Sequence, residues 1–544
     1  MPYGIVGVPS PSRLLWSPAM KRIISHASFV LVVLFGPVVS IGIVATELTY
    51  LHWALPFVAF LWAGLFGLHH LVFGAAPFRR RALRVGIPVL VVALAGFVLS
   101  RLVRYEGSAS GSSYPKLAWV WQEREESGAG EAGEAVVFGA APPPEAIAGD
   151  WPDFLGPGRR GMEDRPAFGT DWAAAPPEPL WRRPMGKGWS SFAVSAGRAL
   201  TQQQRGDDEH VTCLDLATGR ELWSHANPGA RLLLERAEND GAAMGGDGPR
   251  ATPVVDGGRV YAMGATGIVD CLAAEDGSVI WSRPLLRELG GRPHKWGMAN
   301  SPLVLPGEGL VVFAGPDSPG PTLVACDLGT GETGWVHEGG GASYSSPRLL
   351  RLCGREQIVA VNQEDVCGLD PSSGDLLWSH PWPGRFPKAG QPIDLPGDRI
   401  LVTASYGAGS LMLELSQGDD GRIGVAELWK SNHLKTKFSS AVVLDGHAYG
   451  LDEGRFAGID LETGGRVWKR EKFGFGQQLL FGDRVLVQTE PGDVVVGRVG
   501  PGGFEETGRI PALSSMTWNA PAVAGRVLLV RNDREAAAYL LPEP

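Results

Sequence analysis

The chain has 544 residues, with 49 lysines and arginines against 58 aspartates and glutamates, so its formal net charge is −9. This mild acidity gives no electrostatic reason to expect nucleic-acid binding. Its 75 glycines are many for a globular protein and indicate a chain rich in tight turns.

Three apolar stretches dominate the first hundred residues, at about 27–46, 53–74 and 85–103. Each is close to the ~20 residues that a membrane-spanning helix needs. A cleaved signal peptide explains one such stretch but not three. The sequence therefore predicts a membrane anchor over residues 1–104, with three transmembrane helices.

Basic residues predict the orientation of this anchor. Arg13, Lys21 and Arg22 precede the first stretch, and four arginines lie between 79 and 84, before the third. Basic loops stay in the cytoplasm. We therefore expect a multi-pass protein of the cytoplasmic (inner) membrane, with a cytoplasmic N-terminus and a periplasmic or otherwise extracytoplasmic remainder. His69 and His70, late in the second stretch, leave open a haem or proton site beside simple interfacial placement.

Residues 105–150 are rich in Gly, Ala, Pro, Ser and Glu. Such a segment buries too little apolar surface to fold alone and is typical of a tether. We expect an acidic linker between the anchor and the rest of the chain.

A ten-residue pattern then recurs, of which Leu214–Trp223 (LDLATGRELW) and Ile459–Trp468 (IDLETGGRVW) are two of five clean copies. In all five a glycine stands four residues before a tryptophan. With a looser copy and an isolated one, the tryptophans lie about 48 residues apart on average, a period typical of repeat architectures. They are Trp181, Trp223, Trp281, Trp335, Trp378, Trp429 and Trp468.

Each repeat contains two hairpins, because the pattern forms one and an alternating segment such as Thr252–Gly264 forms another upstream. One unit is therefore four antiparallel strands, the blade of a propeller. The sequence predicts an all-β, eight-bladed β-propeller over residues 151–544, with blades beginning near 189, 250, 299, 344, 389, 438, 474 and 518. The seventh repeat lacks its tryptophan and the eighth lacks its fourth strand, so we expect Pro179–Pro184 to close the ring.

The seven tryptophans favour a structural interpretation. A buried indole removes ~200 Å² from water, and repetition at one point of each blade indicates docking between neighbouring blades. A ligand site is expected once, not seven times.

The D-x-x-T-G-x-x-x-W pattern resembles the tryptophan-docking motif of the pyrroloquinoline-quinone-like (PQQ-like) propellers. That family includes quinoprotein alcohol dehydrogenases and the propeller lipoprotein of the outer-membrane β-barrel assembly machinery. The resemblance covers about 180–544, and Asp150–Gly161 resembles the lead-in of membrane-attached members. It implies the fold, whereas the same fold carries unrelated functions.

Within this resemblance, a quinone-dependent enzyme holds its cofactor between a tryptophan and a disulfide of adjacent cysteines, beside calcium. No two of the five cysteines here are adjacent. Four of them are expected on the third strand of successive blades, where we favour core packing over disulfides. The acidic fragments 204–210 and 418–421 lack calcium-ligand spacing and are expected to be hairpin turns. We therefore expect no catalytic residue, no metal site and no cofactor, with pyrroloquinoline quinone and calcium as the alternative.

A candidate binding site follows from the fold. The segments before the innermost strands ring one mouth of the channel, where aromatic, cationic and amide side chains suit an anionic, sugar-like or peptide ligand. The alternative is that they are turn residues closing the channel. The candidates are Lys187, Trp189, Lys295, Trp296, Asn300, Tyr344, Gln391, Lys435, Lys437, Phe438, Trp518 and Asn519.

The preferred function is a non-catalytic, membrane-anchored scaffold that binds a protein or another ligand of the cell envelope. One alternative is a quinone-dependent oxidoreductase of alcohols or sugars, and another is a membrane-side ligand sensor. The long connection 224–250 is either a binding loop or an ornament.

Overall fold

The structure is a computed structural model that describes residues 77–108, 115–122, 133–139, 141–232, 246–384 and 387–544, with single positions between 61 and 71. The chain forms two compact units. One comprises residues 1–104 with 119–121, and the other comprises the remaining residues. Parts of the predicted linker 105–150 and of the connection 224–250 lie outside the described residues.

The N-terminal unit contains helix α3 (Phe78–Leu102), on which the third predicted span falls. Strands β1 (Val103–Ser108) and β2 (Pro115–Trp119) form a small sheet after it. Helix α3 includes five arginines. Among the described residues, no helix combines the length and the apolar character needed to cross a membrane. The prediction of three transmembrane helices is therefore not supported; the stretch 27–46, most of 53–74 and His70 lie outside the described residues.

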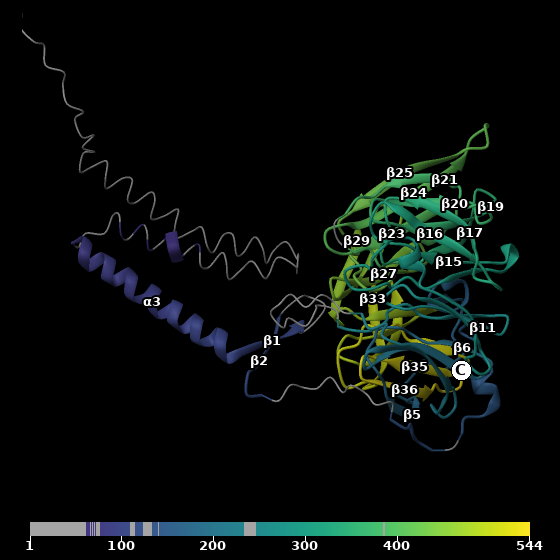
Figure 1. The fold of residues 1–544 in the computed structure, drawn as a ribbon, viewed down its shortest axis with the longest axis horizontal. Helices are drawn as coiled ribbons and strands as arrows, with labels where there is room; N and C mark the ends of the chain where they lie inside the picture. The colour runs from purple at the N-terminus through teal and green to yellow at the C-terminus, as the bar shows by residue number, and fades with distance from the viewer. Residues whose placement is uncertain are drawn as a thin grey trace, which may run out of the picture. The chain divides into compact units, whose positions relative to one another are not determined.

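The second unit is an eight-bladed propeller of antiparallel four-stranded blades, as predicted (Figure 1). In blades 1–7 the four strands follow each other from the inside outward. Blades 1–4 consist of β6 (Ala193–Ser195), β7 (Arg198–Arg205), β8 (Asp208–Asp215), β9 (Glu221–Asn227); β10 (Val254–Asp256), β11 (Arg259–Met263), β12 (Val269–Ala273), β13 (Val279–Arg283); β14 (Leu303–Leu305), β15 (Leu310–Ala314), β16 (Gly320–Asp327), β17 (Thr333–Gly339); and β18 (Arg348–Leu352), β19 (Arg355–Val361), β20 (Asp365–Leu369), β21 (Leu376–Pro381).

Blades 5–8 complete the ring. Their strands are β22 (Ile393–Leu395), β23 (Arg399–Ala404), β24 (Gly409–Gln417), β25 (Ile423–Ser431); β26 (Val442–Leu444), β27 (His447–Asp452), β28 (Arg455–Asp460), β29 (Arg466–Lys472); β30 (Gln477–Phe481), β31 (Arg484–Gln488), β32 (Val494–Gly500), β33 (Gly503–Ile510); and β34 (Ala522–Ala524), β35 (Val527–Arg531), β36 (Glu535–Leu540), β5 (Glu178–Pro184). Innermost strands of neighbouring blades contact each other, as β10 does with β6 and β14, and each begins three or four residues after the predicted blade start.

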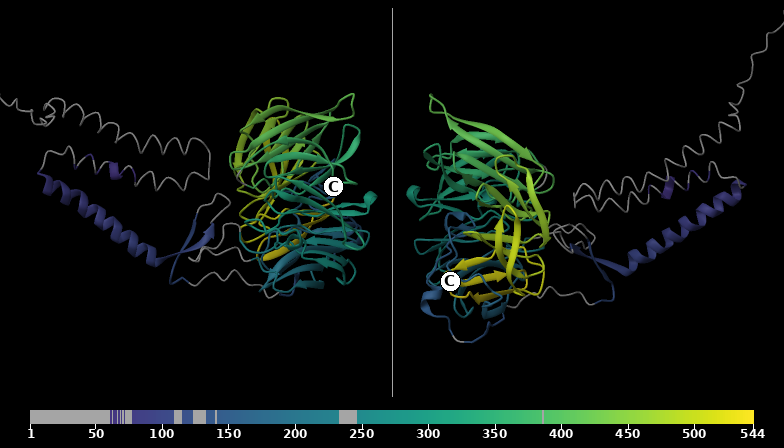
Figure 2. Two further views of the ribbon diagram at one scale, coloured as in Figure 1. Left: turned by 45° about the horizontal axis from the view of Figure 1, so that its top comes forward. Right: turned by 180° about the vertical axis from the view of Figure 1, so that it is seen from behind.

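The ring closes as predicted. Strand β5 pairs with β36 in antiparallel register, with Trp181 opposite Ala538. A further two-residue strand, β3 (Val136–Val137), pairs with the outer edge of β5. The last blade is thus assembled from both ends of the propeller, and Figure 2 shows the yellow C-terminal strands beside the blue N-terminal ones.

At most joints the indole meets the turn of the following blade. Trp181 Nε1 donates to Leu216 O at 2.9 Å, and Trp281 Nε1 donates to Leu328 O at 3.2 Å. The ring also covers the motif glycine of that next blade, where an added Cβ would lie 2.4–2.7 Å from ring atoms. These glycines also have φ of +66° to +74°, so both the ring contact and the backbone conformation exclude larger residues. They are Gly219, Gly277, Gly331, Gly374 and Gly464.

Two joints depart from this pattern. Blade 5 has no motif glycine, and Trp378 Nε1 donates instead to Gln357 Oε1 of its own blade at 2.7 Å. In blade 7, Gly508 follows the β-bulge at the position that tryptophan holds in other blades. The buried Trp172, which precedes β5 in the chain, packs onto Gly508 and so supplies the indole that the seventh repeat lacks.

Residues 150–163, the plug, cross the ring of innermost strands, which closes the central channel. Trp151 pairs with Val194 of β6, and the plug ends in β4 (Met162–Glu163), which runs parallel to β30. Arg159 is 3% exposed. Other contacts join Pro152 O to Val255 N, Arg159 to Ser301 O and Pro302 O, Gly158 O to Arg348, and Met162 Sδ to Val443 N.

Candidate functional site

The face on which the innermost strands begin is here called the mouth face. Two kinds of segment form it, namely the connections that precede the innermost strands and the turns between the second and third strands of each blade. All twelve candidate residues lie in the connections, as expected from the repeat. The plug enters from the opposite face, where β6 ends at Ser195.

An aromatic group spans the junction of blades 6, 7, 8 and 1. The ring centroids of Trp189 and Trp518 lie 4.6 Å apart, and Phe438 lies 4.9 Å from Trp518. Trp518 Nε1 donates to Glu490 Oε1 at 2.9 Å. Each of these rings packs against another ring, so the group acts as a closed core rather than as an open slot.

Lys437 lies beside this group and is only 3% exposed. Its Nζ is 4.5 Å from the ring centroid of Tyr406 and 4.6 Å from that of Phe475. Burial lowers the pKa of the Lys437 ammonium to about 8, against the opposing effect of the Glu453 and Glu490 carboxylates. The aromatic faces and the two carboxylates together keep this buried cation stable.

A second aromatic group lies on blades 3 and 4. Trp296 and Tyr344 have ring centroids 5.9 Å apart, and the exposed Lys295 places its Nζ 4.9 Å from the Trp296 centroid. Burial raises the pKa of the Tyr344 hydroxyl to about 12. It also lowers the pKa of the nearby Arg250 guanidinium to about 10. No ring contact joins the two groups among the described residues, so the predicted residues form two separate groups.

Two of the three predicted amide side chains connect neighbouring blades. Asn300 Nδ2 donates to Ser343 O at 2.8 Å and Ser345 O at 2.6 Å of the next blade. Asn519 Nδ2 donates to Ser190 O at 2.8 Å in the same way. Gln391 is buried and has no hydrogen-bond partner for its amide within the described residues. The two asparagines therefore act as inter-blade ties.

The remaining predicted lysines form ion pairs. Lys187 Nζ lies 2.8 Å from Asp247 Oδ2, and the buried Lys435 Nζ lies 3.7 Å from Asp452 Oδ1. Asp452 is fully buried and also pairs with Lys469 at 3.4 Å. These cations are committed to contacts within the propeller.

Sequence reasoning missed the acidic partners of the mouth face. Glu453 and Glu490 follow the second strands of blades 6 and 7, and Glu209 opens the third strand of blade 1. Glu209 accepts the Ala265 N–H, and burial raises the pKa of its carboxyl to about 8. The alternation of strand direction places these turns on the same face, a signal that was available in the repeat.

The cysteines pack as expected. Four of them lie on the third strands of blades 1–4, and all five are free thiols. Burial raises the pKa of Cys213 to about 12 and that of Cys326 to about 11. The two acidic fragments are hairpin turns, β7–β8 and β24–β25, as predicted. Among the described residues, no three His, Cys, Asp or Glu side chains form a group suited to a metal ion.

The mouth face does not fit the quinone arrangement that the resemblance implies. That arrangement needs a tryptophan with a free face and a disulfide of adjacent cysteines. Trp189 and Trp518 use their faces on each other and on Phe438, and no two cysteines are adjacent.

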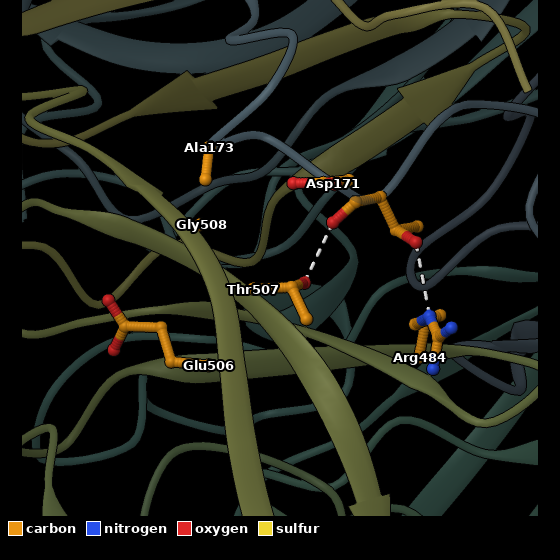
Figure 3. Close-up of a pocket in the computed structure, with 7 residues that line it drawn as sticks. Asp171, Ala173, Arg484, Glu506, Thr507 and Gly508 are labelled. Carbon is orange, nitrogen blue, oxygen red and sulfur yellow. Dashed lines mark hydrogen bonds between the residues drawn. The ribbon is translucent and has the colours of Figure 1, made fainter.

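An open pocket of about 550 Å³ lies elsewhere, on blade 7, where residues 170–173 cross β33 (Figure 3). Thr507 Oγ1 donates to Thr170 O at 2.7 Å, and Arg484 Nε donates to Thr170 Oγ1 at 3.0 Å. Glu506 pairs with Arg509. The charged groups of the pocket are thus bonded to the protein, and we assign it no ligand.

A family model and a solved structure agree with the propeller fold. Residues 207–470 match the family model described as outer membrane protein assembly factor BamB. A quinohemoprotein alcohol dehydrogenase from Comamonas testosteroni superposes with a TM-score of 0.51 at 12% identity, covering 73% of this chain and 81% of its own. BamB from Moraxella catarrhalis gives 0.43 at 15% identity, with 65% and 94% covered.

A computationally designed protein, Ika8, gives a TM-score of 0.44 at 10% identity, covering 66% of this chain and 100% of its own. No curated protein matches the chain. The likeness to the quinohemoprotein alcohol dehydrogenase concerns the fold alone, because the same fold carries several functions. The repeated motif, the eight blades and the family model over residues 207–470 together support a PQQ-like β-propeller.

Proposed function

We propose that this propeller is a non-catalytic scaffold that presents a rigid disc to a protein of the cell envelope. The observation that carries the proposal is the internal use of the mouth face. Lys187 and Lys435 pair with carboxylates, the two asparagines tie blades together, and the aromatic rings pack on one another. The plug closes the channel from the other side.

The family model also supports the scaffold proposal, since the protein for which it is named is an assembly factor. A rigid propeller offers its two faces and its rim to a partner, and pre-organised surfaces bind with little loss of conformational freedom. Location outside the cytoplasm is part of the proposal. Alkaline phosphatase is active only outside the cytoplasm, so a fusion of this enzyme after Pro544 tests that location. An inactive fusion contradicts it.

Site-specific photo-crosslinking of the full chain in cells tests the binding role. The photoreactive residue is placed at Lys295 on the mouth face, at Glu275 in an exposed turn of the opposite face, and at Leu428 on the rim. We expect one dominant cross-linked protein from one of these positions and none from the others. Absence of a specific cross-link at all three positions contradicts the proposal.

Titration of the purified full chain with pyrroloquinoline quinone and calcium tests the oxidoreductase alternative. The scaffold proposal predicts an unchanged melting temperature, because a ligand that binds the folded state raises it. A saturable rise that needs both additions would overturn the proposal in favour of the alternative.

A further inference from the structure

Strand β25 (Ile423–Ser431), the outermost strand of blade 5, is the longest outer strand of the propeller at nine residues. None of its residues is buried, and five are exposed. Figure 1 shows it at the rim of the disc, with the turn that joins it to β24 projecting outward. Within the described part of the chain, no strand pairs with its outer edge.

The outer strands of the other blades carry their β-bulge at a different position from that in β25. A β-bulge precedes each tryptophan position, and bulges twist an edge away from further pairing. In blades 1–4 and 6 this bulge follows the first residue of the outer strand, as between Glu221 and Trp223 in β9. In β25 the bulge comes after five residues, Ile423–Glu427, which pair with β24 in unbroken register.

The outer edges of blades 7 and 8 are already contacted by other segments of the chain. Strand β3 covers β5 in blade 8, and Thr170 bonds Thr507 of β33 in blade 7. Blade 8 also shows that such an edge accepts an added strand, since β3 pairs there in antiparallel register. Blade 5 keeps the same kind of edge without such cover among the described residues.

The chemistry of this edge is apolar and acidic. Ile423 and Val425 pack partly onto the core between blades 4 and 5, and Gly424 and Ala426 are exposed. Residues 409–431 contain four carboxylates (Glu414, Asp419, Asp420, Glu427) and two cations (Arg422, Lys430), so their formal charge is 2 − 4 = −2. All four carboxylate residues are exposed.

We propose that the edge Ile423–Glu427 docks an extended strand of a partner protein whose apolar residues alternate with basic ones. Main-chain hydrogen bonds give such strand addition its affinity, and alternate side chains give it specificity. The acidic turn 418–421 and Glu427 select basic side chains in the added strand. This inference rests on the proposed scaffold function and names its docking surface.

The test uses the full chain and a fluorescein-labelled nine-residue peptide of alternating valine and lysine. Two control peptides carry N-methyl groups on alternate residues, which block strand pairing, or glutamate in place of lysine. We expect the valine–lysine peptide to bind at least about tenfold more tightly than either control, measured by fluorescence anisotropy. Hydrogen exchange should show new protection at amides 423–427.

Matched variants separate this edge from general charge attraction. Asp419→Lys with Asp420→Lys should weaken peptide binding at least about tenfold. Glu275→Lys with Glu332→Lys changes the net charge equally, in the turns before β13 and β17, and should leave binding within about twofold. Equal weakening by both pairs, or equal binding of the N-methylated peptide, overturns the inference.

Two outcomes assign the edge differently. If the chain dimerises without peptide and amides 423–427 are protected in the dimer, a second copy occupies the edge and the inference is wrong. If photo-crosslinks form at Lys295 or Glu275 while the peptide does not bind, the scaffold function stands and only this surface fails. If neither cross-links nor peptide binding occur, the scaffold function itself fails.

Discussion

Blades 1–6 and the seam of blades 7 and 8 are held by different means. Along blades 1–6, neighbours in the sequence are neighbours in space, and an indole of one blade covers the glycine turn of the next at most joints. At the seam, β5 completes blade 8 and Trp172 docks on blade 7. Both come from residues 170–184, more than three hundred positions away in the chain.

The difference teaches where the propeller depends on long-range contacts. A joint between successive blades closes a short loop, whereas the seam must close a loop of almost the whole domain, and loop closure costs conformational entropy. The seam compensates with more partners, because Phe168 packs on Phe481, Arg182 bonds Ala512 O, and the plug crosses the channel. We therefore expect changes at the seam to affect the whole propeller.

The largest expected effect is that of removing the seam's central strand. Deletion of residues 532–544 removes β36, which bridges β35 and β5. We expect loss of cooperative unfolding, because the deletion leaves β35 and β5 with backbone groups that β36 paired in the parent chain. Circular dichroism during thermal unfolding checks it. Deletion of Glu543 and Pro544 alone is the control, and an unchanged transition in the longer deletion contradicts the closure.

Trp172→Ala tests whether the borrowed indole equals a regular one. The Trp172 side chain is 3% exposed, and that of Trp281, a docking residue of blade 2, is 8% exposed. Large-to-small changes of buried aromatic residues cost about 3–5 kcal/mol in unfolding free energy. We expect both Trp172→Ala and Trp281→Ala to fall in that range by chemical denaturation. A cost below about 1 kcal/mol for Trp172→Ala alone would mean that blade 7 docks without it.

Gly331→Ala tests whether the indole of one blade confines the motif glycine of the next. Gly331 has φ +74° and an added Cβ would lie 2.6 Å from the Trp281 ring, whereas Gly197 has φ +72° and open space. Both variants bear the left-handed backbone cost of about 1 kcal/mol. Gly331→Ala should cost about 1–3 kcal/mol more, because the indole must shift. Equal unfolding free energies of the two variants would show that the indole does not confine this glycine.

A further expected effect is a pH dependence that differs between the two regions. Burial raises the pKa of Glu209, at the joint of blades 1 and 2, from 4.5 to about 8. It raises the pKa of Asp153, in the plug, from 3.8 to about 6. In each window the folded state holds a proton that the unfolded state has lost, so stability falls as the pH rises.

Glu209→Gln should remove the fall between about pH 4.5 and 8, while the fall due to Asp153, complete by about pH 6, persists. The expected difference is a few kcal/mol, since one pKa unit corresponds to about 1.4 kcal/mol. Unfolding free energies of both proteins at several pH values measure it. Parallel profiles for variant and parent between pH 6 and 8 would show that Glu209 does not titrate there.

Much of the propeller was predictable because each repeat contains its own local signals. Asp215 and Gly219 specify one turn, since Asp215 Oδ1 accepts the Thr218 N–H and Gly219 takes positive φ. The same holds for the hairpins, the blade starts and the third-strand cysteines. The closing strand was predictable because Pro179–Pro184 has a strand pattern and no blade of its own.

The candidate site was predictable only as a list of residues on one face. Strand alternation assigns Lys437, Trp518 and Asn519 to that face, but their partners come from other blades. Glu490 accepts from Trp518, and Ser190 O accepts from Asn519. No local pattern encodes such contacts, because they depend on how blades rotate around the axis.

The sequence by itself determined the repeat, the strands within each blade and the number of blades, since turns and alternating side chains act over a few residues. Only the tertiary structure decided which indole covers which glycine, because each motif glycine meets the tryptophan of the preceding blade and not its own. It also decided that Trp172 serves blade 7 and that residues 150–163 close the channel. Ring closure brings together groups that are remote in the chain, and packing selects among them by shape and by hydrogen bonds.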